Sequence, residues 1–284
     1  MSLTLLAPTD FSRSARNAVS YAAEMARRMK GKLILFHAYL PPVPVSEIPM
    51  VIPLPAESET YIFKKLKRIK NDLLSKRGNK NLEIEIVCTC GVPVDEIYLY
   101  TLRNKVDFVI VGMQGKGFLR EKLIGSTTTS LIQKSEVPVL SIDGKVKFRT
   151  IKKIVFASDD KGNVSQSTLQ PLSKFCSVFK SHIYVLNIVL GRDLSEDSGA
   201  NFKKKISSSF KKLDHSIHRI INSTIVQGLK DFITLKRMDM LVMIPHQHNL
   251  TELILNGRQT KQMAFHSTVP LLSLHEKKHK IPTP

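Results

Sequence analysis

The feature of this sequence that most restricts its fold is an internal duplication. "LLAPTDFS" from Leu5 aligns with "VFASDDKG" from Val155, and "MKGKLILFHAYL" from Met29 aligns with "FKSHIYVLNIVL" from Phe179. Both alignments have an offset of 150 residues and contain no gap. The chain is therefore expected to build the same structural unit twice.

A second pair of matching blocks lies further along the chain. "KVDFVIVGM" from Lys105 aligns with "RMDMLVMIP" from Arg237, now at an offset of 132, so the second copy is shorter. Much of the difference is expected in the proline-rich stretch 40–58 of the first copy, because prolines exclude regular helix and central strand. We expect two domains over 1–145 and 150–277, followed by a flexible tail over 278–284.

Each copy alternates apolar runs with amphipathic segments. In the first copy, Ser12 is expected to cap a helix that ends near Lys30, and a second helix is expected over about 57–76. The expected strands are "LTLLA", "KLILFHAY", "EIEIVCT", "VDFVIV" and "PVLSI". Strands separated by helices pair in parallel with right-handed crossovers. Each copy therefore predicts an α/β fold with a doubly wound five-stranded parallel sheet, and the strand order 3-2-1-4-5 is assumed by analogy.

The formal net charge of +19 raises the question of nucleic-acid binding. The lysines of "YIFKKLKRIKNDLL" and "NFKKKISSSFKKL" lie between apolar residues at helical spacing, as on the solvated faces of amphipathic helices. No aromatic-rich strand accompanies them, as an RNA-binding sheet would require. We therefore do not expect specific nucleic-acid binding.

Composition also bears on location. No apolar run approaches the roughly 20 residues of a membrane-spanning helix, and the amino terminus lacks the basic region of a secretory signal. The chain has three cysteines. Cys88 and Cys90 are interpreted as buried thiols, because no second ligand pair completes a metal site. We expect a soluble, cytoplasmic protein with no membrane contact, in a reducing compartment.

Doubly wound sheets bind ligands at the carboxyl ends of their strands, so two turns are candidates. The first, "APTDFS", contains no glycine, which excludes a G-x-G-x-x-G dinucleotide motif there. Asp10 would repel phosphate and suits the adenine or ribose end of a nucleotide. An equally good interpretation is that Asp10 caps the next helix in competition with Ser12.

The second turn, "GMQGKGFLREKLIGST", follows the fourth expected strand. Gly112 and Gly115 would let the backbone approach a ligand closely. Gly125 and Ser126 open a helix whose free amide groups and dipole favour phosphate. Additional charge is available from Lys116, Arg120 and Lys122.

The spacing G-x2-G-x9-G-S, together with "PTD", "VPVL" and "CGVPVDEI", resembles the ATP-binding class of the universal stress protein family. The resemblance covers both halves, so the chain resembles a tandem universal stress protein with an adenine nucleotide alpha hydrolase-like fold. It implies a nucleotide site formed by Pro8, Thr9, Asp10, Ala38, Val111, Gly112, Gly115, Gly125, Ser126 and Thr127. Met113 and Gln114 occupy the variable positions of the loop.

The second copy departs from this pattern. At the positions of the three glycines and Ser126 it carries Ile244, Gln247, Gly257 and Arg258. Asp159 and Asp160 both fall in its first turn, where they would oppose a polyphosphate. We expect that this copy does not bind ATP, although Arg258 and His246 could hold another anion. The family implies that the copies pair through their last strands as an internal pseudo-dimer; whether a further homodimer forms is left open.

The residues indicate no catalytic site. No nucleophile stands beside a base, and His37 alone at the end of a strand is more typical of a packed histidine. The resulting hypothesis is an ATP-binding stress-response or signalling protein rather than an enzyme, at most a slow ATPase, with Mg²⁺ or Mn²⁺ arriving with the nucleotide. The alternative is a nucleotide-independent scaffold that binds acidic partners or nucleic acid.

Overall fold

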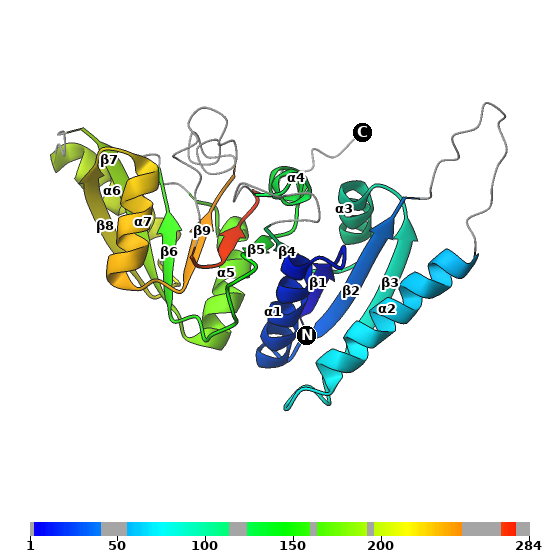
Figure 1. Ribbon diagram of the computed structural model, residues 1–284. Coiled ribbons are helices and arrows are strands. Elements are labelled where there is room, and N and C mark those ends of the chain that lie inside the picture. Colours follow the sequence, from blue (N-terminus) through cyan, green and yellow to red (C-terminus); the bar gives the residue numbers. More distant parts are fainter. Residues whose placement is uncertain are drawn as a thin grey trace, which may run out of the picture.

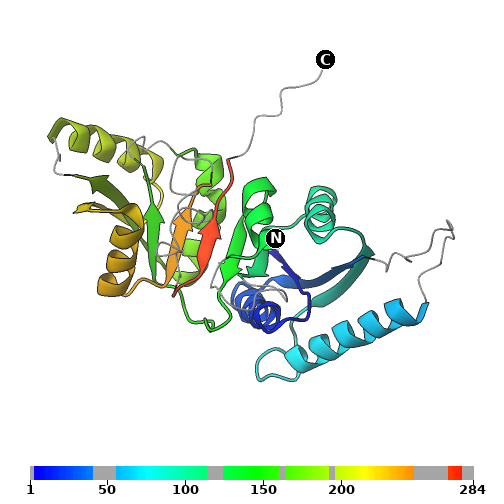
Figure 2. The same cartoon turned by 45° about the horizontal axis from the view of Figure 1, so that its top comes forward.

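The computed structural model describes residues 3–40, 56–113, 124–159, 164–191, 196–245 and 268–276. Within these residues the two halves form a single sheet of ten strands, flanked by helices (Figure 1). The strand order is β3-β2-β1-β4-β5-β10-β9-β6-β7-β8, which is the expected order 3-2-1-4-5 written twice around a centre. Helices α2 and α6 lie toward opposite ends of the molecule (Figure 2).

The first half follows the pattern that the sequence predicts. Its elements are β1 (Thr4–Pro8), α1 (Arg13–Arg28), β2 (Lys32–Tyr39), α2 (Ala56–Leu74), β3 (Ile84–Cys90), α3 (Pro93–Arg103), β4 (Phe108–Gly112), α4 (Ser126–Lys134) and β5 (Val139–Ile142). Ser12 is the N-cap of α1, since its hydroxyl accepts a hydrogen bond from the Ala15 amide at 3.1 Å. Residues 41–55 of the proline-rich stretch lie outside the described residues.

The second half repeats this order as far as it is described. Its elements are β6 (Lys153–Ala157), α5 (Gln166–Phe179), β7 (His182–Leu190), α6 (Glu196–Ser209), β8 (His215–Asn222), α7 (Ile225–Lys236), β9 (Met240–Met243) and β10 (Leu271–Ser273). None of the described helices is long and apolar enough to cross a membrane. Residues 277–284, which include the predicted tail, are not among the described residues.

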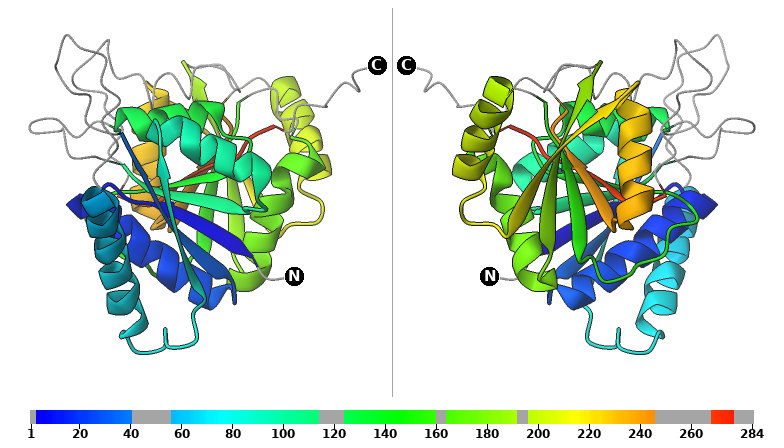
Figure 3. Two further views of the ribbon diagram at one scale, coloured as in Figure 1. Left: turned by 90° about the vertical axis from the view of Figure 1, so that its right-hand side faces the viewer. Right: turned by 90° about the vertical axis from the view of Figure 1, so that its left-hand side faces the viewer.

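The two halves meet through their last strands, as the family resemblance implies. β5 and β10 pair antiparallel, with Leu140 opposite Leu272, and every other pairing in the sheet is parallel. The expected two sheets are therefore one continuous sheet. Successive strands turn relative to one another when viewed from either end (Figure 3), the usual consequence of strand twist.

The strand pairing corrects the internal alignment by one residue. Leu5 pairs with Phe108 in the first half, and Ile154 pairs with Met240 in the second. Ile154, and not Val155, is therefore the counterpart of Leu5, and the offset in this strand is 149 rather than 150. A shift of one residue moves a side chain to the other face of the sheet. With the corrected offset, Leu5 and Ile154 both face the same core.

One face of the sheet carries a core that runs through both halves. Helices α1, α2, α5 and α6 pack on this face, and the opposite face is covered by α3 and α4 in the first half and by α7 in the second. α5 also reaches the first half, because the Phe175 ring lies 6.4 Å from the Phe108 ring of β4. The burial of these apolar side chains stabilises the arrangement of the two halves.

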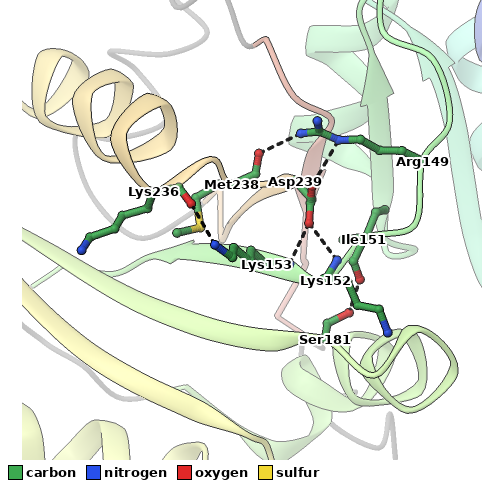
Figure 4. Close-up of polar contacts among 8 residues, drawn as sticks. All are labelled: Arg149, Ile151, Lys152, Lys153, Ser181, Lys236, Met238 and Asp239. Atoms are coloured by element: carbon green, nitrogen blue, oxygen red, sulfur yellow. Dashed lines mark hydrogen bonds and ion pairs between the residues drawn. The ribbon is translucent and has the colours of Figure 1, made fainter.

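The segment between the halves is fixed by Asp239 (Figure 4). One carboxylate oxygen of Asp239 accepts hydrogen bonds from the backbone amides of Lys152 and Lys153, at 2.8 and 2.9 Å. The other oxygen pairs with Arg149 Nε at 3.1 Å, and Arg149 Nη2 donates to the Met238 carbonyl at 3.0 Å. Asp239 therefore ties the start of β6 and the linker to the start of β9.

The first half contains the equivalent carboxylate. Asp107 accepts a hydrogen bond from the Thr4 amide at 2.9 Å and pairs with Lys174 Nζ at 3.2 Å. Lys174 lies on α5, so the cation comes from the second half. The duplicated aspartates both bind the first strand of their own half, and each recruits a cation from outside it.

Candidate functional site

The structure brings the predicted ligand residues to one edge of the sheet. β1 lies between β2 and β4, and all three run in the same direction. Their carboxyl ends carry Pro8, Ala38 and Gly112, respectively. Because strand order reverses between β1 and β4, this edge is the topological switch point at which such sheets bind ligands.

The first turn is held by its own side chains. Asp10 Oδ1 accepts a hydrogen bond from the Ser12 amide at 2.9 Å, while Ser12 caps the helix. Asp10 is therefore not the N-cap of α1, and the alternative interpretation of this residue is wrong. Thr9 is buried, and its hydroxyl accepts a hydrogen bond from the Phe11 amide at 3.1 Å. The turn is rigid before any ligand binds.

Phe11 is a feature that the sequence did not indicate. Its φ angle is 65°, in the left-handed region that bulky residues rarely adopt. Its ring lies 4.6 Å from the His37 ring, and His37 Nδ1 lies 2.7 Å from the Thr9 carbonyl oxygen. His37 is thus packed and hydrogen-bonded, as predicted. It points to the opposite face of β2 from Ala38, because side chains alternate along a strand.

The glycine at the end of β4 serves packing rather than ligand approach. A Cβ atom at Gly112 would lie 2.7 Å from Ser14 Oγ, 2.8 Å from the Ser14 carbonyl carbon and 3.0 Å from the Ala15 amide nitrogen. These atoms belong to the first turn of α1. The prediction that Gly112 makes room for a ligand is therefore wrong in its reason, because α1 occupies that room.

The N-terminus of α4 is positioned by β4. The Gly125 amide donates to the Met113 carbonyl at 2.6 Å, and Thr128 Oγ1 donates to the Gly112 carbonyl at 2.8 Å. Gly125 is the N-cap and provides no side-chain cap, while Ser126 and Thr127 are exposed. The first turn of α4 thus presents amide groups and two hydroxyls beside the end of β4. Such an N-terminus favours an anion.

Several predicted loop residues cannot be placed. Gln114, Gly115, Lys116, Arg120 and Lys122 lie outside the described residues. Asp160, His246, Gln247, Gly257 and Arg258 of the second half also lie outside them. Of the predicted nucleotide residues, Pro8, Thr9, Asp10, Ala38, Val111, Gly112, Gly125, Ser126 and Thr127 are described and gather at one edge.

The second half has a similar first turn built from different residues. The Ser158 amide donates to the Leu186 carbonyl at 2.9 Å, as the Thr9 amide does to Phe36. Asn187, the counterpart of His37, donates from Nδ2 to the Ser158 carbonyl at 3.3 Å. Ile244, the counterpart of Gly112, is buried in the core that α5 covers. Its side chain therefore fills the helix-covered core, and not the crevice as predicted.

Met113 connects this edge to the other half. It was predicted as a variable loop position, yet it is buried against the apolar cluster of the second half that contains Val269 and Leu271. His275, which follows β10, lies with Nε2 2.7 Å from the Ile132 carbonyl of α4. The candidate site thus adjoins the contact between the halves.

The cysteines and acidic residues indicate no metal site. Cys88 is half-buried and Cys90 is exposed, so the interpretation of both as buried thiols is wrong for Cys90. β3 is an edge strand, which leaves the end of that strand accessible. Within the described residues, no three His, Cys, Asp or Glu side chains are grouped so as to hold a metal ion.

The fold and this edge define a doubly wound α/β protein whose two copies share one sheet. The model of the universal stress protein family matches residues 1–142, half of the chain. The chain therefore belongs to the universal stress protein family.

Individual proteins agree with this assignment. The chain is 28% identical to Universal stress protein MJ0577 of Methanocaldococcus jannaschii over 153 residues, which cover 50% of the chain and 94% of that protein. It is 26% identical to Universal stress protein MJ0531 of the same organism over 143 residues, 49% of the chain and 80% of that protein.

A solved structure matches both halves together. The crystal structure of a universal stress protein from Archaeoglobus fulgidus superposes with a TM-score of 0.68, covering 95% of the chain and 97% of that structure. The sequence identity is 13%, so this similarity establishes the fold alone. The arrangement of two copies in one chain is shared with that protein.

Proposed function

We propose that the first half binds an adenine nucleotide, with ATP as the leading candidate, at the carboxyl ends of β1, β2 and β4. The observation that carries the proposal is the N-terminus of α4. Gly125 leaves its first turn without a side-chain cap, and Ser126 and Thr127 are exposed. Phosphates would bind to these amides and hydroxyls, and the base and ribose would lie nearer Pro8, Asp10 and Ala38.

The same half can hold the nucleotide without catalysing its hydrolysis. His37 is engaged with the Thr9 carbonyl on the other face of β2, so it is not available to orient a water molecule. We propose that occupancy alters the surface near Met113, which contacts the second half. Mg²⁺ or Mn²⁺ would accompany the phosphates. The function is then that of a nucleotide-dependent stress-response or signalling protein.

Calorimetric titration of the full chain with ATP and Mg²⁺ tests this proposal. We expect one site per chain and a loss of affinity of about tenfold in Ser126→Ala, since one hydrogen bond to a charged group contributes about 1.5 kcal/mol. Ser165→Ala is the matched control, because Ser165 caps α5 in the second half through the Thr168 amide. It should lower stability without changing nucleotide affinity.

The choice of nucleotides decides between the remaining alternatives. A universal stress protein has been crystallised in complex with cAMP, so cAMP belongs in the same titration as ATP, ADP and AMP. The absence of heat with all four would favour a nucleotide-independent scaffold. Steady turnover of ATP that is lost in Asp10→Ala would instead establish a slow ATPase.

A further inference from the structure

The outer strands of the second half carry a continuous chain of polar side chains. His182 is the first residue of β7, Ser216 and His218 lie on β8, and Asp214 comes directly before β8. Asp214 Oδ2 lies 2.9 Å from His182 Nδ1. His182 Nε2 lies 2.9 Å from Ser216 Oγ, and Ser216 Oγ lies 2.9 Å from His218 Nε2. We call these four residues the histidine–serine chain.

The donors and acceptors of the histidine–serine chain follow from Asp214. A carboxylate can only accept, so His182 Nδ1 carries the proton that it donates to Asp214. In the neutral ring, His182 Nε2 is then an acceptor and receives the Ser216 hydroxyl proton. Ser216 Oγ in turn accepts from His218 Nε2. This assignment places a base beside the hydroxyl and a carboxylate behind the base, which is the arrangement that activates a serine nucleophile.

Neighbouring aromatic rings hold the two imidazoles in place. The Tyr184 ring lies 4.8 Å from the His182 ring and 5.4 Å from the His218 ring, and the Phe232 ring of α7 lies 5.3 Å from His218. Burial lowers the pKa of His218, and the charges of Lys236 and His182 lower it further. The lowered pKa favours the neutral His218 ring, and the tautomer with its proton on Nε2 donates to Ser216 Oγ.

In the first half, a lysine and a glutamate occupy the places of His182 and Ser216. Leu33 pairs with Ile84, and Ile183 pairs with His215, so Lys32 is the counterpart of His182 and Glu85 the counterpart of Ser216. Lys32 forms ion pairs with Glu83 and Glu85. Hydrogen bonding to Glu85 raises the pKa of Lys32, so this side chain remains a cation. An ammonium group has no lone pair with which to accept a hydroxyl proton, whereas the unprotonated nitrogen of a neutral imidazole has one.

The histidine–serine chain is partly exposed to solvent. The Asp214 side chain is 76% exposed and the His182 side chain 32% exposed. Ser216 and His218 are half-buried, as their position on an edge strand requires. The carboxylate end of the histidine–serine chain is therefore exposed, and the Tyr184 and Phe232 rings pack beside its imidazoles.

We propose that Ser216 is a nucleophile that accepts an acyl group from an activated ester. Ser216 Oγ attacks the carbonyl carbon, and its proton passes to His182 Nε2. The bond between that carbon and the leaving oxygen breaks, and His182 returns the proton to the departing alcohol. The product is an ester of Ser216. Asp214 is a positioning residue, since it contacts His182 and not the reacting atoms.

Labelling with an alkyl fluorophosphonate tests the nucleophile directly in the full chain. Ser216 Oγ displaces fluoride from phosphorus and loses its proton through His182, so the adduct is stable and can be located by peptide mass spectrometry. We expect one adduct, on Ser216. The internal controls are Ser165 and Ser167, whose hydroxyls lie 2.9 Å apart and contact no imidazole among the described residues; both should stay unlabelled.

Variants separate a chemical role from a structural one. His182→Gln keeps a hydrogen-bonding side chain but removes the base, and should slow labelling on the order of 100-fold. Asp214→Asn should slow it at least about tenfold, because the ring loses its fixed orientation.

Three results would overturn the proposal. One is a labelling rate at Ser216 no greater than at Ser165. Another is unchanged labelling in His182→Gln when circular dichroism shows that this variant is folded. The third is an unchanged rate of fluorophosphonate labelling, or of p-nitrophenol release from p-nitrophenyl acetate, in Asp214→Asn. Each is measured on the intact protein and needs no nucleotide.

Discussion

Gly112 and Ile244 occupy equivalent places at the ends of β4 and β9, and the two halves use them in opposite ways. At Gly112 the first turn of α1 approaches so closely that no side chain fits. At Ile244 a large side chain is buried. The turns before the helices also differ in length, because α1 begins four residues after Thr9, whereas α5 begins eight residues after Ser158. The longer turn thus accompanies the larger side chain.

The largest effect on stability is expected when Gly112 is given the side chain of its counterpart Ile244. Gly112→Ile should lower the free energy of unfolding by at least about 3 kcal/mol, because the new Cβ would meet backbone atoms of Ser14 and Ala15. The denaturant midpoint of the full chain measures it. Gly144→Ala is the matched control, since its Cβ would lie 3.7 Å from Ser14 Cα, an ordinary contact. Equal midpoints for both variants would contradict the packing role of Gly112.

The next effect concerns the duplicated aspartates. Asp239→Ala should cost about 2 kcal/mol, because two backbone amides and Arg149 lose their shared partner. Asp107→Ala should cost about 1 kcal/mol, because one amide and Lys174 are affected. The same denaturation experiment ranks the two variants. A larger loss at Asp107 would show that the contact from α5 stabilises more than the linker does.

A smaller effect, of opposite sign, is expected at the contact between the halves. The hydroxyls of Ser141 and Ser273 are fully buried on β5 and β10 and have no hydrogen-bond partner among the residues that the structure describes. Ser141→Ala or Ser273→Ala should therefore stabilise the chain by up to about 1 kcal/mol. Ser135→Ala is the control. Ser135 Oγ donates to the Val137 carbonyl, so this substitution should lower stability. Destabilisation by all three substitutions would show that buried hydroxyls are satisfied at this contact.

The duplication and the alternation of strands and helices predicted two doubly wound parallel units. The strand order came from analogy and the pairing of the last strands from the family resemblance, and the structure confirms both. The register of the first strand was not predictable. β1 and β6 are buried on both faces, so Val155 and Ile154 match Leu5 equally well in apolar character. The pairing of β1 and β6 with their neighbouring strands shows that Ile154 is the counterpart of Leu5.

The candidate site was predictable in its position and less so in its contacts. The two turns follow from the rule that ligands bind at the carboxyl ends of strands, and Ser126 from its place at the start of a helix. Pro8 and Ala38 came from the family resemblance. The atoms that approach Gly112 do not follow from the sequence, since a glycine in a motif does not reveal what packs against it. Ser216 was also missed, because β7 and β8 bring it to His182 from 34 residues away. No sequence motif with a short spacing indicates this contact.

The smallest expected effect is a pH dependence of stability that arises from the second half. The folded state lowers the pKa of His218 from its ordinary value of 6.5, so the unfolded chain binds a proton more readily. The free energy of unfolding should therefore decrease as the pH falls through about 6.5. This loss should be complete once the pH is below the pKa of His218 in the folded state. Denaturant midpoints of the chain and of His218→Gln, measured from about pH 7.5 to about pH 5, should converge as the pH falls. Val87 occupies the equivalent place in the first half and cannot titrate, so Val87→Ile should leave the pH dependence unchanged. Midpoints of the chain and of His218→Gln that fall in parallel would show that His218 is as easily protonated in the folded state as in the unfolded one.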